Sequence, residues 1–180
     1  VDATLAFIAG QIETERDELT RGTHAERRET VALLLDGAPI PLRRAEARLG
    51  YALTGEHTAV VVWSDDPAGD LARLDTLVTQ LGRAAGARPL SVLASAATRW
   101  VWIPGHGGID VAALQDSLSA PGDIHIAIGP TAEGVDGFRR SHLDALTTQQ
   151  MMARLRSPQP VARFTDIQFV ALLTTEPDRA

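Results

Sequence analysis

The sequence predicts an α+β fold, in which a βαββαβ unit forms an antiparallel sheet with helices on one face, preceded by N-terminal helices. Two observations lead to this prediction. From residue 58 onward, short apolar runs rich in β-branched residues alternate with segments of helical periodicity. The apolar runs 90–94 and 99–103 are separated by residues 95–98 alone, which is typical of a hairpin in the middle of the unit.

The N-terminal helices begin with a regular apolar spacing. Val1, Leu5, Ile8 and Ile12 step by 4, 3 and 4 residues, which is typical of a coiled-coil seam. A seam of about two heptads is too short to be stable alone. Either a second copy of the chain or the chain's own domain covers it, and we keep both interpretations. Residues 1–50 are therefore assigned to a helical linker and residues 51–176 to the domain that follows.

Two further helices are expected before the domain starts. Thr23 and Glu26 have the spacing of a capping box, so a helix should follow them and end at Asp36. A short helix is expected over residues 42–49, where Gly50 is well placed as its C′ residue.

The domain has the predicted order β-α-β-β-α-β-α-β, and its first six elements have the ferredoxin-like order. Trp100 and Trp102 share one face of the hairpin, which either lies in the core under a helix or forms a surface for a second copy. The long helix is expected to start at about Phe138, with Leu143 among its inward residues, and Asp166 is expected to N-cap a last helix. The strands are expected over 58–63, 90–94, 99–103, 124–129 and 161–164, and the helices over 71–85, 111–118, 138–155 and 167–173.

Composition excludes several classes of function. The chain has no Cys and no Lys, which rules out thiol chemistry, Schiff-base catalysis and a P-loop lysine. The net charge of −6 argues against direct DNA binding. The sequence has neither an apolar stretch long enough for a membrane span nor a signal-peptide pattern, so we expect a cytoplasmic protein. Because it begins at Val1, we expect a fragment of a longer chain.

One segment resembles a known family. Ala127-Ile128-Gly129 has the form of an (A/G)-x-G strand end, and Gly137 to Ala145 has the form G-(L/F)-x-x-S-x-x-(E/D)-A. Together they resemble the PucR/CdaR family of bacterial transcription regulators. Residues 161–173 also resemble the family's V-x-(R/x)-(Y/F)-x-D segment, so the resemblance spans roughly residues 51–173.

The resemblance implies a central GGDEF-like domain, which shares the fold of nucleotide cyclases. In such regulators this domain is expected to dimerise and relay a signal, and no cofactor is implied. DNA would be bound only through a C-terminal helix-turn-helix outside this chain. A small-molecule effector and a homodimer, with Leu5, Ile8 and Ile12 in its seam, are the partners we expect.

Catalysis is not expected. A diguanylate cyclase needs a carboxylate after its first strand, and both glycine and a carboxylate in the hairpin, to hold metal and nucleotide. Residues 94–99 contain no Gly, Asp or Glu. Asp65 and Asp66 follow the first strand and could be a vestigial metal site, although they also fit an ordinary turn. A divergent cyclase remains the alternative.

A ligand site is a further hypothesis. Gly137 is expected in the loop before the long helix, and Arg139, Arg140 and Ser141 in the first turn of that helix, where these residues could bind an anion or a nucleotide phosphate. Alternatively, the glycine only shapes a loop and the arginines pair with nearby acids or with a partner subunit. The five histidines have no metal-ligand spacing, so we assign no metal site.

Overall fold

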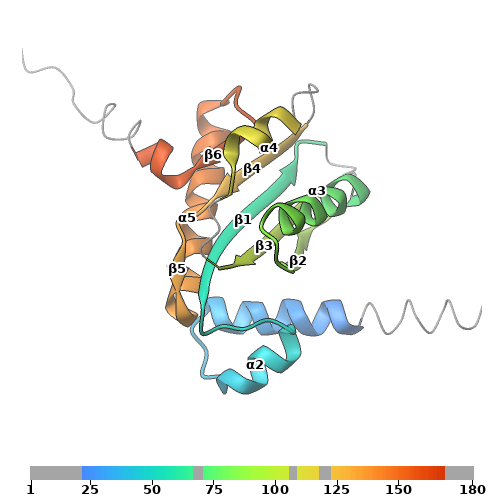
Figure 1. Ribbon diagram of the computed structural model, residues 1–180, viewed down its shortest axis with the longest axis vertical. Helices are drawn as coiled ribbons and strands as arrows, with labels where there is room; N and C mark the ends of the chain where they lie inside the picture. Colours follow the sequence, from blue (N-terminus) through green and yellow to red (C-terminus); the bar gives the residue numbers. More distant parts are fainter. Residues whose placement is uncertain (1–21, 67–70, 106–108, 118–122, 169–180) are drawn as a thin grey trace, which may run out of the picture. The chain divides into compact units, whose positions relative to one another are not determined.

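The computed structural model describes residues 22–66, 71–105, 109–117 and 123–168 (Figure 1). The chain divides into two compact units, Val1–Leu49 and Gly50–Ala180. The predicted seam residues Leu5, Ile8 and Ile12 lie outside the described residues.

Within its described residues, the first unit contains two helices, which cover residues 22–35 and α2 (Leu42–Leu49). An ion pair of 3.2 Å joins Arg48 Nε to Glu26 Oε1. Thr23 lies inside the first helix, so the prediction that it begins this helix is wrong. Gly50 follows α2 with a φ of 60°, the left-handed conformation that a C′ glycine adopts readily.

Within the described residues, the second unit contains a six-stranded sheet in the order β2-β3-β1-β4-β6, with β5 paired to β1. The pairings are antiparallel except that of β4 with β6, which is parallel. The predicted α+β class and mostly antiparallel sheet are therefore confirmed. The strands are β1 (Glu56–Ser64), β2 (Leu90–Ser95), β3 (Thr98–Pro104), β4 (Ile124–Ile128), β5 (Ala132–Glu133) and β6 (Val161–Arg163).

Helices α3 (Leu71–Ala84) and α4 (Val111–Ser117) cover one face of this sheet. Val60, Val62 and Val101 point to that face, where they form one apolar cluster with Leu74 of α3 and Leu114 of α4. The βαββαβ part of the domain therefore has its helices on one face, as predicted. Removal of these aliphatic side chains from water is the main favourable term that holds the layers together.

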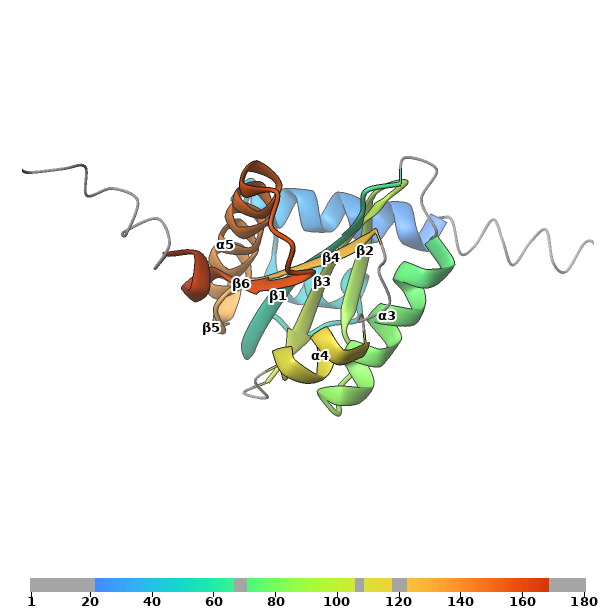
Figure 2. The ribbon, with the colours of Figure 1, turned by 90° about the horizontal axis from the view of Figure 1, so that it is seen from above.

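Helix α5 (Gly134–Leu155) covers the opposite face, so the sheet lies between α5 and α3 (Figure 2). The ring of Trp102 stacks on Phe138 with centroids 4.3 Å apart and planes 5° apart. Its indole Nε1 donates a hydrogen bond of 3.1 Å to the Phe138 carbonyl. The core interpretation of this hairpin face is therefore confirmed at Trp102, which is fully buried under a helix of its own chain.

Three local predictions are wrong. Helix α5 begins at Gly134, four residues before Phe138. The helix after β6 begins at residue 164, so Asp166 does not N-cap it. Instead the Asp166 carboxylate accepts the Arg163 backbone N–H at 3.1 Å, the reverse half of a capping box. Leu143, expected to face inward, is 60% exposed.

Candidate functional site

The residues after β1 and the β2–β3 turn meet at one end of the sheet. The backbone N–H of Ser64 donates to the Ala97 carbonyl at 2.9 Å. The turn runs from Ser95 to Thr98, which are paired, and it carries neither a carboxylate nor a glycine. The nearest cation on the hairpin, Arg99, forms an ion pair of 2.7 Å with Asp75 of α3. The turn itself therefore presents methyl and hydroxyl groups where a cyclase needs an acid.

Asp65 is held by a histidine. Its Oδ2 lies 2.8 Å from Nε2 of His125, whose ring stacks on Trp63 at 5.2 Å. The Asp65 backbone N–H donates to the Asp123 carbonyl at 2.8 Å, and the Asp66 N–H donates to Ser64 Oγ at 3.2 Å. Both aspartates therefore take part in turn geometry. Among the residues that the structure describes, no group of three or more His, Asp or Glu side chains could hold a metal ion.

The four residues predicted as an anion site do not converge. Gly137 and Ser141 are buried in α5. Arg139 Nη1 lies 3.6 Å from Asp136 Oδ1, one turn earlier in the same helix, and Arg140 is exposed. Since α5 starts at Gly134, these residues lie beyond its first three positions, and the expectation that they form the helix start is wrong.

Gly137 and Ser141 instead bring α5 close to the sheet. A Cβ on Gly137 would lie 2.5 Å from the Ala132 backbone carbon, and a Cβ on Gly129 would lie 2.0 Å from the Ser141 carbonyl oxygen. Non-bonded atoms essentially never approach so closely, so only glycine fits at either position. The small residues of the family-like motif therefore have a packing role.

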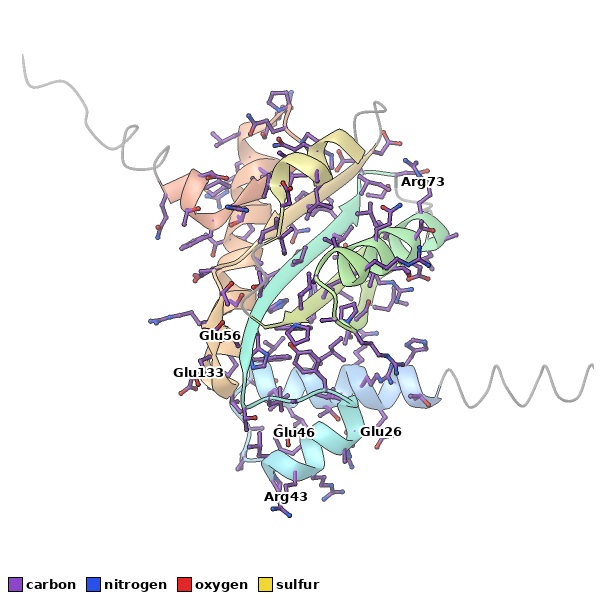
Figure 3. The ribbon with its side chains drawn as sticks, viewed as in Figure 1. Glu26, Arg43, Glu46, Glu56, Arg73 and Glu133 are labelled. Atoms are coloured by element: carbon purple, nitrogen blue, oxygen red, sulfur yellow. The ribbon has the colours of Figure 1, made fainter. Side chains whose placement is uncertain are left out.

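Ser141 also fills a gap in the hydrogen-bond ladder of β1. Along this edge β1 pairs first with β5, where Glu56 is opposite Glu133 (Figure 3), and then with β4 from Val60 onward. Between the two partners the Ala59 N–H donates to Ser141 Oγ at 2.7 Å. The hydroxyl thus satisfies a buried backbone donor that neither strand reaches.

A cluster of aromatic and histidine side chains lies under α5. A carbonyl can only accept, so Nε2 of His57 donates to Leu53 O at 3.2 Å and its Nδ1 accepts from the Tyr51 hydroxyl at 2.8 Å. Burial lowers the pKa of His57 and raises that of Tyr51. Both groups are therefore neutral at pH 7.

His142 belongs to the same cluster and is 1% exposed. It packs against Trp100 and Trp102, with centroids 4.5 and 5.0 Å away, and neither ring nitrogen has a hydrogen-bond partner. Burial lowers the pKa of His142 to about 4. A neutral, enclosed imidazole cannot serve as an acid or base for a substrate in solution.

A pocket that the sequence did not indicate lies where β4 and β6 end. Its volume is about 200 Å³, and Thr58, Thr131 and Arg163 are among its lining residues. These residues come from segments far apart in the sequence, so no local sequence motif contains them. Only the parallel pairing of β4 with β6, which the sequence analysis did not predict, could have drawn attention to this edge.

Among the described residues, no helix is long and apolar enough to cross a membrane. Residues 35–151 match the family described as the GGDEF-like domain. No curated protein matches the sequence.

Proposed function

This chain belongs to the family of GGDEF-like domains, and on that premise we propose that it is a non-catalytic domain of a bacterial transcription regulator of the PucR/CdaR type. In this proposal the domain dimerises and relays a signal to a DNA-binding region outside these residues. The motif from Ala127 to Ala145 supports the family type, and the net charge of −6 supports DNA contact elsewhere in the protein. We place it in the cytoplasm.

The β2–β3 turn carries the non-catalytic part of the proposal. Phosphoryl transfer in a cyclase needs metal ions held by carboxylates, because these ions neutralise the charge that develops on the phosphates. The turn from Ser95 to Thr98 offers none, and Asp65 is engaged by His125. The turn therefore lacks the carboxylate that a cyclase adds to those after its first strand to hold the metal ions.

A divergent nucleotide cyclase is the second candidate, favoured by the position of Asp65 and Asp66 at the end of β1 beside the turn. Incubation with ATP or GTP and Mg²⁺ or Mn²⁺, with an active diguanylate cyclase assayed in parallel, separates the two. We expect no cyclic product. Product formation by this chain that disappears in D65A would establish the cyclase and refute the proposal.

Dimerisation is tested by size-exclusion chromatography with light scattering. We expect a dimer at tens of micromolar. The spacing of the predicted seam places Ile8 on it and Ala6 off it, so I8D should shift the mass toward the monomer and A6D should not. A wild-type chain that stays monomeric at this concentration contradicts the dimer, and equal effects of I8D and A6D contradict the seam.

The regulator class has its own test. We expect the coding sequence downstream of Ala180 to encode a helix-turn-helix region with a basic recognition helix. A downstream region of another kind would remove the transcriptional part of the proposal and leave the non-catalytic domain untouched.

A further inference from the structure

The pocket at the ends of β4 and β6 follows from a βαβ unit inside an otherwise antiparallel sheet. β4 and β6 run side by side in parallel, with Ile128 opposite Arg163, and α5 connects them (Figure 1). In such units the loops that follow the parallel strands meet at one edge and leave a crevice there, which is where open sheets bind ligands. Here residues 129–131 follow β4 and residues 164–165 follow β6, and both segments line the pocket.

The polar lining of this pocket has one sign. Arg163 and the threonines Thr58, Thr131 and Thr165 line it, and among the described residues no carboxylate does. This is notable in a chain that has 23 acidic residues and a net charge of −6. A guanidinium with hydroxyl donors is the set of groups that recognises oxyanions through charge-assisted hydrogen bonds.

Three of these donors, Arg163, Thr58 and Thr131, are oriented by hydrogen bonds within the chain. Nη2 of Arg163 donates to the Ile109 carbonyl across the pocket, which fixes the guanidinium and leaves its other N–H groups for a ligand. Thr58 is 4% exposed, and its hydroxyl lies 2.6 Å from that of Thr131. Because only one proton is used between these two oxygens, the second hydroxyl proton remains available. Such preorganisation lowers the entropy cost of binding.

The rest of the lining is apolar. Ile109, Ile128 and Phe164 form walls, which a bare inorganic anion would not use. A cavity of about 150 Å³ accommodates benzene, so a pocket of about 200 Å³ suits a ligand slightly larger than benzene. From these observations we propose that the pocket between the ends of β4 and β6 binds a small monocarboxylic acid, with its carboxylate on Arg163 and its hydrocarbon body against Ile109, Ile128 and Phe164.

The site differs from the four residues that the sequence suggested. Arg139 and Arg140 lie on α5 and do not line this pocket. An occupant would touch both the loop that leads into α5 and the residues that begin the helix after β6, so it would hold these two segments together. The idea that this contact takes part in signal relay is the only part of the proposal that rests on the proposed function.

Thermal shift and isothermal titration of the intact chain test the site. The probes are benzoate and hexanoate, with neutral benzamide and inorganic phosphate as comparisons. We expect the two carboxylates to raise the melting midpoint at millimolar concentration, since a ligand that binds only the native state stabilises it. Benzamide and phosphate should bind at least roughly tenfold more weakly, because each lacks one half of the recognition.

Two variants tie the binding to this pocket. R163M should weaken carboxylate binding roughly tenfold or more, the effect of losing a charged hydrogen bond. T165V removes one hydroxyl from the exposed rim, where the fold does not depend on it, and should weaken binding several-fold. R140M, which removes an exposed arginine outside the pocket, is the matched control and should bind as the wild type does.

Three results would overturn the proposal: no binding by either carboxylate at 10 mM (roughly the weakest affinity that a site should show), equal binding by R163M and R140M, or phosphate binding as tight as that of benzoate. If R163M does not fold, T165V alone decides between the site and its absence. Since dimerisation and nucleotide turnover are measured separately, a failure of this site would leave the proposed function standing, and the reverse also holds.

Discussion

A single methyl group at Gly129 should displace α5 from the sheet. In the G129A variant the new Cβ would lie 2.0 Å from the Ser141 carbonyl oxygen and 2.9 Å from Ser141 Oγ. Backbone atoms of a long helix cannot rotate away, so α5 must move by roughly 1 Å to restore a tolerable contact. The hydrogen bond of 2.7 Å from the Ala59 N–H to Ser141 Oγ would then lie outside the usual range.

The magnitude follows from two terms. Overpacking of a well-packed site costs about 1–3 kcal/mol, and a buried N–H that loses its partner costs about 1–3 kcal/mol more. The free energy of unfolding should therefore fall by roughly 2–6 kcal/mol, which for a chain of this size corresponds to roughly 5–20 °C in melting temperature. S141A removes the hydrogen bond without adding a methyl group, so it should lower the free energy of unfolding by only the second term, about 1–3 kcal/mol.

Urea denaturation followed by circular dichroism measures the effect. The matched control is G55A, because a Cβ on Gly55 meets nothing within 4 Å and its φ is not in the left-handed region. That variant should be neutral or slightly stabilised, since alanine restricts the unfolded chain. If G129A unfolds within about 0.5 kcal/mol of G55A, the close approach of α5 to the sheet, and with it the packing role of the motif, is refuted.

Two other predictions concern buried side chains that can carry a charge. The pKa of His142 is about 4 in the folded chain and about 6.5 in the unfolded chain. As the pH falls, the unfolded state therefore takes up a proton first. The free energy of unfolding should drop by roughly 3 kcal/mol between pH 6.5 and 4. Urea midpoints across this range should show a flatter profile in H142L, whereas the exposed-site control H24L should keep the full slope. D75N removes the carboxylate from Arg99, whose side chain is 10% exposed, and should lower the free energy of unfolding by about 1–2 kcal/mol. E26Q, in the more exposed pair with Arg48, should change that free energy by under about 0.5 kcal/mol. Equal losses in the two variants would contradict this difference.

The parts of the fold that could be predicted from the sequence have a strong apolar signal. The run from Thr58 to Trp63 has no polar residue after its first, and it forms the central strand β1, with neighbours on both edges and helices on both faces. The hairpin could also be predicted from the sequence, because only a tight turn fits between Ala94 and Arg99. Local patterns of this kind arise because certain positions are buried, and the spacing of apolar residues along the sequence indicates which positions these are.

Helix α5 shows why the remainder was missed. Besides Phe138 and Met152, its buried side carries Gly137, Ser141, His142, Ala145 and Thr148, which give little hydrophobic signal. Glycines such as Gly134, at a φ of 71°, and Gly137 are typical of loops in a sequence, whereas the helix starts at the first and packs closely through the second. The need for small residues comes from the distance between α5 and the sheet, a tertiary property that no window of sequence contains.

The same contrast bears on what a family-like motif can say about ligands. The segment from Gly129 to Ala145 is the most family-like stretch of the chain, and the structure gives its glycines and serine a role in joining α5 to β1 and β5. Residues that hold two elements at a fixed distance are needed whatever the domain binds, so such a motif identifies the fold and leaves the ligand open. The ligand-specific groups should then lie where the elements so joined expose their strand ends. In this chain that place is the edge beyond Ile128 and Arg163, and the comparison of R163M with R140M is therefore a more direct test of whether the domain binds a ligand than any change within the motif.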